Sequence, residues 1–209
     1  MDKRQKDTIE AYNITAKDFS VKIGNLQNYN CTYDYLIQIL NENDHVLDLA
    51  CGPCQICKYI GEKKKVNITG VDLSQEMLKL AKENIPGGNF IEDSITSFKS
   101  SIFYDLVIIG FGIPYLNKNQ LIKCVENSVS LIKENGYFYL SFMDGNKEGY
   151  EKTSFGGENK FYVYYHNKDE VKSILENNGL KIIKEYILDY EEQDGRITKD
   201  IIYICKKNK

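Results

Sequence analysis

Short apolar runs alternate with amphipathic, helix-type segments along most of this chain. Five runs have the length and composition of buried strands, and segments with apolar residues at spacings of three and four separate most of them. The runs are residues 45–50, 67–73, 89–93, 104–111 and 137–144. A run that is apolar almost throughout indicates a strand covered on both faces. The alternation therefore predicts an α/β fold with a doubly wound, mostly parallel sheet.

Further segments flank this alternation at both ends of the chain. Two helical patterns predict an N-terminal helical cap over residues 1–43. Residues 180–190 and 197–207 predict two late strands, and the short turn that contains Asp194 and Gly195 predicts an antiparallel hairpin at the sheet edge. The result is a Rossmann-like sheet of seven strands, whose ligand crevice lies at the carboxyl ends of the parallel strands.

The segment between the fifth strand and the next helix, residues 144–166, is unusually long and contains several glycines. Because loops of this length in a compact domain often close over a site, we expect it to form a lid, with "FYVYY" as a strand. Asn167, with Glu170 three residues later, predicts a capping box for the helix that follows. Earlier in the chain, Gly136 is expected to end a helical region before the fifth strand.

Composition limits the number of domains and the class of partner. With 209 residues and 42% hydrophobic content, the chain is long enough for one well-buried domain, which we expect to span residues 1–209. Lys and Arg number 27 against 30 Asp and Glu, so the basic excess typical of nucleic-acid binders is missing. No apolar run approaches the roughly 18 residues of a membrane span, and the start of the chain is polar. We therefore expect a cytoplasmic protein without nucleic-acid or membrane partners.

Three of the six cysteines lie close together, at Cys51, Cys54 and Cys57. This spacing resembles the start of an iron–sulfur ligand run, but "KYIGEKKK" follows Cys57 where such a run needs a further cysteine. No fourth ligand lies nearby, and the two histidines are far apart. The sequence therefore predicts free thiols and no metal site, with Cys54 and Cys57 on one face of a helix.

Acidic residues follow the first three predicted strands. Asp48 precedes a turn of small residues, "ACGPC", where backbone N–H groups can approach a ligand closely. Asp72 ends the second strand, where a carboxylate can accept two hydrogen bonds from a ribose diol. Asp93, beside Ser94, closes the third strand and is placed to face the exocyclic amine of a base. Together these strand ends predict a nucleoside-type site, although "ACGPCQ" lacks the G-x-G-x-x-G of nicotinamide-dependent oxidoreductases.

The order of these motifs resembles that of class I S-adenosylmethionine-dependent methyltransferases. The similar stretches are "VLDLACGPC", "GVDLS", "FIEDS", "YDLVIIGFGIPYL" and "GYFYLSF". They run from about residue 44 to 143, and the predicted final hairpin is also typical of that family. The resemblance implies S-adenosylmethionine as the cofactor and methyl transfer as the reaction.

The resemblance also implies a set of cofactor contacts. Asp48 would orient the loop and the methionine end, and Asp72 would bind the ribose hydroxyls, while Asp93 would face the adenine amine. The other implied contacts are Ala50, Cys51 and Gly52 at the methionine end, Leu73 and Ser94 near the adenine, with Ile95 beside it, and Gly110 and Phe111 between cofactor and acceptor.

The loop departs from the family pattern G-x-G-x-G, because those positions read Ala50, Gly52 and Cys54. If the third position needs a positive φ, cysteine there is strained by roughly 1–2 kcal/mol. If the position needs only a small side chain, the cost is slight. The alternatives stay open at this point, together with the effect of Cys54 on cofactor affinity.

The favoured function is an enzyme that methylates a small-molecule acceptor by in-line displacement. A general base is needed only if the acceptor holds its proton at neutral pH, and Tyr12, Tyr115 and His166 are the candidates. The acceptor pocket is expected between the leading helix, the loop 110–116 and the lid segment. The alternative is a cofactor-binding regulatory protein of the same fold with little or no turnover. The acceptor atom, whether N, O, C or S, and the oligomeric state are left open.

Overall fold

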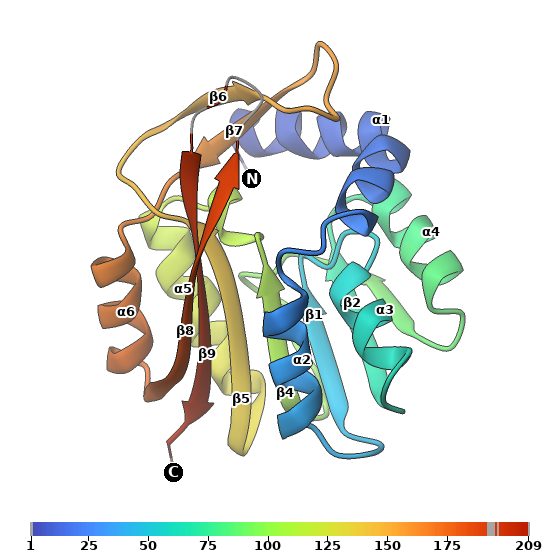
Figure 1. Cartoon of the computed structure of the whole chain (residues 1–209), viewed down its shortest axis with the longest axis vertical. Coiled ribbons are helices and arrows are strands. Elements are labelled where there is room, and N and C mark those ends of the chain that lie inside the picture. Colours follow the sequence, from blue (N-terminus) through green and yellow to red (C-terminus); the bar gives the residue numbers. More distant parts are fainter. Residues whose placement is uncertain (1, 192–194, 196, 209) are drawn as a thin grey trace.

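Seven strands form one sheet in the computed structural model, which describes residues 2–191, 195 and 197–208 (Figure 1). In spatial order they are β3 (Asn89–Glu92), β2 (Asn67–Asp72), β1 (His45–Leu49), β4 (Tyr104–Gly110), β5 (Ile132–Met143), β9 (Ile197–Lys207) and β8 (Leu180–Glu191). The first five are parallel to one another, whereas β9 is antiparallel to both β5 and β8. The predicted doubly wound sheet with a C-terminal hairpin is confirmed. Asp194 of the predicted turn lies outside the described residues.

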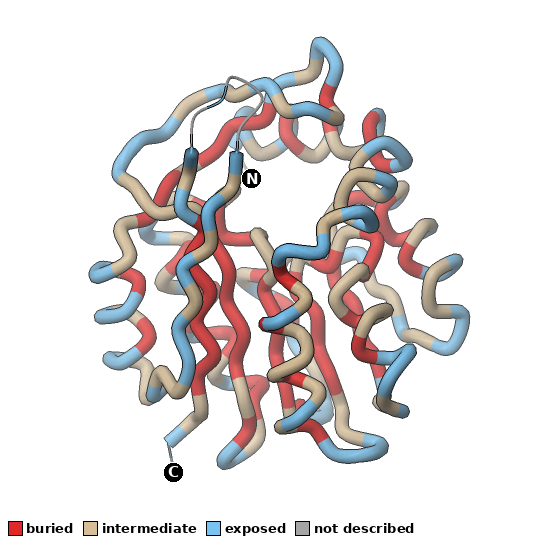
Figure 2. Tube along the Cα trace, viewed as in Figure 1, coloured by how far each residue is buried: buried red, intermediate tan, exposed pale blue. Residues whose placement is uncertain are grey.

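Helices cover both faces of the sheet. They are α1 (Lys3–Gly24), α2 (Asn30–Ile39), α3 (Gln55–Gly61), α4 (Gln75–Asn84), α5 (Lys118–Leu131) and α6 (Lys168–Asn177), with a short 3-10 helix η1 (Ile113–Tyr115). In Figure 1, α5 and α6 lie on one face, and α2, α3 and α4 lie on the other. Successive residues of β4 illustrate the reason, since Leu106 and Ile108 belong to one buried cluster and Val107 and Ile109 to another. Figure 2 shows that the buried residues follow the strands between these helix layers.

Two local predictions differ from the structure. Gly136 does not end a helical region, because α5 ends at Leu131 and β5 begins directly at Ile132, which pairs with Tyr104. A Cβ at Gly136 would lie 2.7 Å from the Ile132 side chain, so glycine lets this strand bend against its own start. The predicted capping box at Asn167 is only half formed. Its side chain accepts two backbone N–H groups, but the Glu170 carboxylate pairs with a lysine instead.

The segment 144–166 contains a two-stranded antiparallel hairpin of β6 (Glu148–Lys152) and β7 (Lys160–Tyr164). It lies beside α1, above the ends of the parallel strands (Figure 1). The hydroxyl of Thr8 in α1 accepts the backbone N–H of Tyr162 at 3.1 Å, and the Arg4 guanidinium lies 4.4 Å from the Tyr162 ring centre. We refer to α1 and this hairpin together as the roof. Among the residues that the structure describes, no helix has the length and apolar character needed to cross a membrane.

Candidate active site

A cavity of about 1050 Å³ opens at the carboxyl ends of β1, β2 and β4, beneath the roof. The chain leaves β1 toward β2 on one side, while β4 flanks β1 on the other, so this is the point where the strand order reverses. Open α/β sheets place their ligand crevices at such points, because the loops on either side diverge. The volume lies slightly above the roughly 300–1,000 Å³ of typical ligand pockets.

The loop between β1 and α3 turns by means of three residues with positive φ. Ala50, Gly52 and Cys54 have φ values of 56°, 53° and 61°. The open question about Cys54 is therefore answered, because this position is left-handed and carries the strain of roughly 1–2 kcal/mol expected for a residue with a Cβ. Its side chain is fully buried, away from the cavity wall, so sterics alone do not obstruct a ligand.

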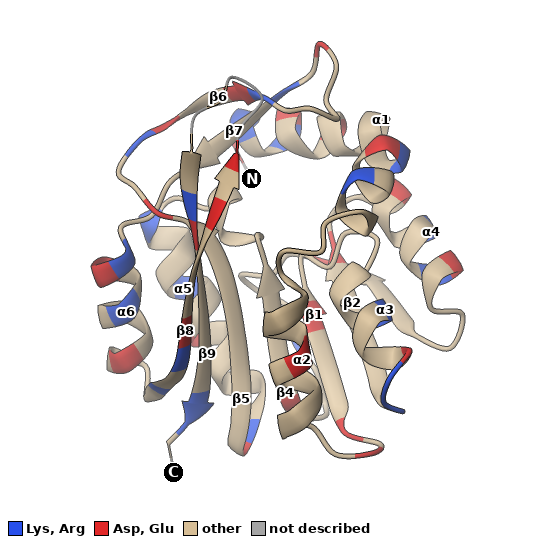
Figure 3. Ribbon diagram, viewed as in Figure 1, with Lys and Arg blue, Asp and Glu red and all other residues tan. Residues whose placement is uncertain are grey.

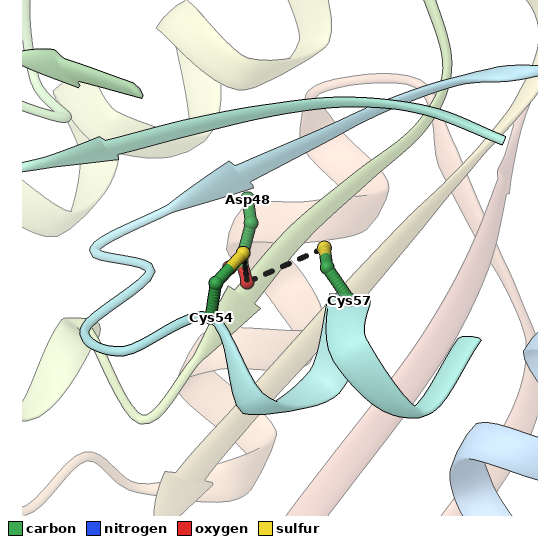
Figure 4. A group of neighbouring side chains, drawn as sticks. All are labelled: Asp48, Cys54 and Cys57. Atoms are coloured by element: carbon green, nitrogen blue, oxygen red, sulfur yellow. Dashed lines mark hydrogen bonds between the residues drawn. The ribbon is translucent and has the colours of Figure 1, made fainter. Parts of the chain in front are cut away.

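Asp48 lies beneath this loop, at the end of β1, and is almost fully buried. Its Oδ2 accepts hydrogen bonds from the thiols of Cys54 and Cys57, at 3.7 and 3.6 Å, and both thiols point toward the carboxylate in Figure 4. Burial raises the pKa of Asp48 to about 7, against a smaller lowering by the two thiols. Asp48 also lines the cavity. Among the described residues, thiols supply the hydrogen bonds to this weakly solvated carboxylate, which can therefore accept a further cationic or hydrogen-bonding group.

Asp72, at the end of β2, connects two loops and lines the cavity. Its Oδ2 accepts the N–H of Gly52 and its Oδ1 accepts the N–H of Ser74, each at 2.8 Å. Burial raises the pKa of Asp72, whereas backbone N–H donors lower it. Each carboxylate oxygen can accept more than one hydrogen bond, so a diol in the cavity would find acceptors already oriented. Leu73, next along the chain, adds apolar surface to the same wall.

The ends of β3 and β4 provide some, but not all, of the predicted residues to the cavity wall. Ser94, Ile95, Gly110 and Phe111 line the cavity. Asp93 lies outside the cavity wall, and its Oδ1 accepts the N–H of Ser94 at 2.6 Å within its own turn.

Phe111 takes a positive φ of 54° and its backbone N–H is held by the hydroxyl of Ser141 at 3.0 Å. Its ring packs edge-on to Tyr29 of the N-terminal segment, with 5.5 Å between ring centres. Through this contact the loop after β4 connects the strand ends to the N-terminal segment at Tyr29.

The three candidate bases lie in different surroundings. The hydroxyls of Tyr12 and Tyr115 form a short hydrogen bond to each other on the cavity wall. Burial raises the pKa of Tyr115 to about 12 and that of Tyr12 well above its ordinary value. Both hydroxyls therefore stay protonated at neutral pH.

His166 lies outside the cavity wall. Its Nε2 lies 3.0 Å from the carbonyl of Ile113, and burial lowers its pKa. The structure therefore does not bring His166 to the site, and its contact with η1 is structural.

Several cavity residues have no local signal in the sequence. Asp200 in β9 is 3% exposed and accepts a hydrogen bond from the Tyr29 hydroxyl at 2.6 Å, and both residues line the cavity. An aspartate within the apolar run "ITKDIIYIC" was the available clue. The aromatic rings of Phe19 and Phe155 lie 4.9 Å apart on the opposite wall, although more than a hundred residues separate them. Among the described residues, Thr153 Oγ1 is the buried side-chain oxygen or nitrogen without a hydrogen-bond partner.

Comparison with known proteins gives consistent results. Residues 46–136 match the profile of the family described as "Methyltransferase domain". Trans-aconitate 2-methyltransferase of Rhodopseudomonas palustris (strain BisB18) is 28% identical over 117 residues, which are 55% of this chain and 45% of that protein. The chain spans about half the length of the curated relatives it matches.

Solved structures share the fold at low sequence identity. The 1,6-didemethyltoxoflavin-N1-methyltransferase of Burkholderia thailandensis, with bound 1,6-didemethyltoxoflavin and S-adenosylhomocysteine, has a TM-score of 0.72 at 13% identity and covers 98% of this chain and 87% of its own. Magnesium protoporphyrin IX methyltransferase of Synechocystis PCC 6803, with bound S-adenosylmethionine, has a TM-score of 0.70 at 16% identity and covers 90% and 82%.

Proposed function

We propose that this chain is a class I S-adenosylmethionine-dependent methyltransferase and that it transfers a methyl group from S-adenosylmethionine to a small-molecule acceptor. One observation carries this proposal. The cavity joins the acidic and glycine-containing ends of β1 and β2 to an aromatic wall beneath the roof, in one space of about 1050 Å³. This space is large enough for a nucleoside cofactor and a small acceptor together.

The residues of the strand ends fit a cofactor of this kind. Asp72 offers the ribose hydroxyls two oriented carboxylate oxygens, and Leu73 and Ile95 offer apolar surface to an adenine ring. The methionine end would lie against the backbone of Ala50, Cys51 and Gly52. Added atoms at Gly52 would reach within 3.5 Å of the Phe19 ring, so a larger side chain here would take up cavity space. Asp48 would attract the amino group of this end.

At the third and fourth strand ends, Ser94, Gly110 and Phe111 complete the proposed contacts. Asp93 is the weakest member of the set implied by the resemblance, because its carboxylate faces its own turn. We expect the adenine edge to be read by backbone and hydroxyl groups at Ser94 and Ile95.

The cofactor supplies a sulfonium methyl group, which needs no covalent nucleophile from the protein. The protein's task is to align the acceptor with that methyl group, and proximity and orientation can contribute roughly 7–11 kcal/mol. Tyr12 and Tyr115 are protonated at neutral pH, and one hydroxyl donates to the other, so the pair keeps one O–H group that can donate to the acceptor and position it. The roof would exclude water from the reacting groups, which makes residues 144–166 the proposed lid.

The walls beneath the roof favour a small acceptor with an apolar or aromatic surface. Tyr12, Phe19 and Phe155 pack as mutually contacting rings at this wall. The buried hydroxyl of Thr153, which lacks a partner, provides one hydrogen-bonding position for a polar group of the acceptor. In Figure 3, acidic and basic residues are interspersed along α1 and the hairpin, whereas a phosphate backbone would require a continuous basic surface. All six cysteines are free, which supports a reducing, cytoplasmic location.

The test combines binding with turnover. S-adenosylmethionine and S-adenosylhomocysteine are expected to raise the melting temperature, since a ligand at about 100 times its Kd adds about 2.7 kcal/mol of stability. A metabolite panel rich in small aromatic compounds is then screened for consumption of the methyl donor. Absence of cofactor binding would contradict the proposal. Binding without donor consumption across a broad panel would favour the regulatory alternative.

A further inference from the structure

Asp48, Cys54 and Cys57 form a buried cluster between β1 and the start of α3 (Figure 4). The ligand atoms of the three residues, one carboxylate oxygen and two thiol sulfurs, all lie within 4.8 Å of one another. The three-residue spacing brings Cys57 onto the same side of the first helical turn as Cys54. The left-handed backbone at Cys54 turns this residue back toward β1. Both thiols consequently meet the carboxylate at one point.

The two sulfur–oxygen distances in this cluster are close to those of a tetrahedral metal centre. Zinc binds thiolate sulfur at about 2.3 Å and carboxylate oxygen at about 2.0–2.2 Å, which places sulfur and oxygen about 3.5 Å apart and two sulfurs about 3.8 Å apart. The observed distances from Asp48 Oδ2 are 3.7 Å to the sulfur of Cys54 and 3.6 Å to that of Cys57. We propose that these three residues bind one thiophilic divalent cation, of which zinc is the representative.

The surroundings of the cluster provide an entry path and room for a fourth ligand. Asp48 lines the large cavity, and so does Cys51, whose side chain adjoins the loop that covers the cluster. An ion can therefore reach the carboxylate from the cavity side and keep a water molecule as its fourth ligand. A buried divalent ion requires anionic ligands, and it would offset two of the three negative charges of two thiolates and one carboxylate.

This site revises the expectation from sequence that no metal is bound. That expectation considers cysteines and histidines that lie close together along the chain, and it assigns Asp48 to the loop and the methionine end of the cofactor. The structure adds the carboxylate as the third ligand. The site does not depend on the proposed function, because its occupation can be measured without cofactor or acceptor.

The test is a cadmium titration of the full chain, reduced with a phosphine and kept free of cofactor. Thiolate-to-cadmium absorption in the ultraviolet is expected to saturate at one equivalent, with the intensity of two thiolates. Cys54→Ser and Cys57→Ser are each expected to lose at least about tenfold in affinity. Asp48→Asn should weaken binding while the absorption per bound ion is unchanged. Matched controls are Cys31→Ser, at an exposed cysteine, and Cys205→Ser, at a buried one in β9. Both are expected to bind cadmium as the unaltered chain does.

A second measurement uses the unaltered chain, so its result does not depend on whether the variants fold. Cadmium is expected to protect Cys54 and Cys57 from alkylation during brief partial unfolding, and to leave Cys31 as reactive as before. Mass spectrometry of the labelled peptides gives both results. Absence of saturable binding, binding that survives in the Cys54→Ser/Cys57→Ser double variant, or protection of Cys31 alone would overturn the proposal.

Discussion

The two halves of the cavity are built in different ways. The half formed by the strand ends consists of loops that follow β1, β2 and β4, and backbone N–H groups fix its carboxylate at Asp72. The half formed by the roof is held by side chains from distant parts of the chain, such as Arg4 with Tyr162, and Tyr12 joins it to Tyr115 in the loop after β4. The sheet already determines where the strand-end loops lie, and hydrogen bonds from their backbone N–H groups fix the position of the Asp72 carboxylate. Because the roof half depends on side-chain contacts between distant segments, the residues of its wall can change without altering the sheet.

The interactions that hold the two halves of the cavity in place also differ in strength. The ion pair of Arg4 with Glu148 joins the N-terminus of α1 to the hairpin, but both side chains are about half exposed. Exposed pairs of this kind contribute roughly 0–1 kcal/mol. The strand ends, by contrast, rest on β1, β2 and β4, whose central residues are mostly buried on both faces of the sheet. We therefore expect the cofactor half to be rigid and the roof to open for exchange of the acceptor.

The largest expected effect is on cofactor binding at the strand ends. Asp72→Ala removes the acceptors of the ribose hydroxyls and frees the N–H of Gly52, so affinity for S-adenosylhomocysteine should fall by about 1–3 kcal/mol. Isothermal titration calorimetry gives the value. Asp93→Ala is the matched control, with an expected loss within about 0.5 kcal/mol. Equal losses at the two positions would remove the distinction between a carboxylate that faces the cavity and one that faces its own turn.

A glycine-to-alanine substitution in each half compares how tightly the two halves of the cavity are packed. At Gly112 an added Cβ would lie 2.8 Å from the Cβ of Ala50, so Gly112→Ala should lower the free energy of unfolding by about 1–3 kcal/mol. At Gly149 in β6 an added Cβ meets nothing within 4 Å, and Gly149→Ala should be close to neutral. Urea denaturation measures both. Similar losses would show that the two halves are packed alike.

The tyrosine pair tests whether the roof half serves the acceptor. Tyr115→Phe leaves the buried Tyr12 hydroxyl without its partner and should cost about 1–2 kcal/mol of stability. Tyr12→Phe/Tyr115→Phe should recover part of that loss, because both polar groups are gone. In the double variant the affinity for S-adenosylhomocysteine should be unchanged, while kcat/KM for the acceptor falls. A double variant that binds the cofactor more weakly and keeps its kcat/KM would reverse the assignment of the two halves.

The smallest expected effect concerns the strained loop. Cys54→Ala keeps the left-handed strain and removes the thiol, whereas Cys54→Gly removes both. The glycine variant should therefore be more stable than the alanine variant by about 1 kcal/mol, the reverse of the usual order for these two residues near a helix. Thermal unfolding of the two proteins side by side measures this difference. An alanine variant that is the more stable of the two would mean that the loop relaxes to another conformation.

The sequence predicted the strand-end half better than the roof half, for a physical reason. Asp48 and Asp72 stand directly after strands, so the alternation of apolar runs fixes where they lie. The sequence leaves the strain at Cys54 as one of two alternatives, because the presence of a cysteine does not reveal the φ angle of the backbone at that position. The roles of these residues in binding stay predictions, as do those of Ser94, Gly110 and Phe111.

The cavity contacts away from the strand ends depend on how distant segments meet. Tyr29 and Asp200 lie 171 residues apart, and no local spacing connects them. The hairpin of β6 and β7 was expected only as a lid with one strand in "FYVYY". His166, chosen for its chemistry alone, packs against η1 outside the cavity wall, because only the tertiary fold determines which way its ring points.

Hydrogen exchange of the unaltered protein, with and without S-adenosylhomocysteine, tests the central claim most directly. If the strand ends hold the cofactor, the amides around Gly52, at Leu73 and Ser74, and at Phe111 should exchange more slowly when it is bound. The amides of β6 and β7 should change less. Protection confined to the hairpin and α1, with none at the strand ends, would contradict the account.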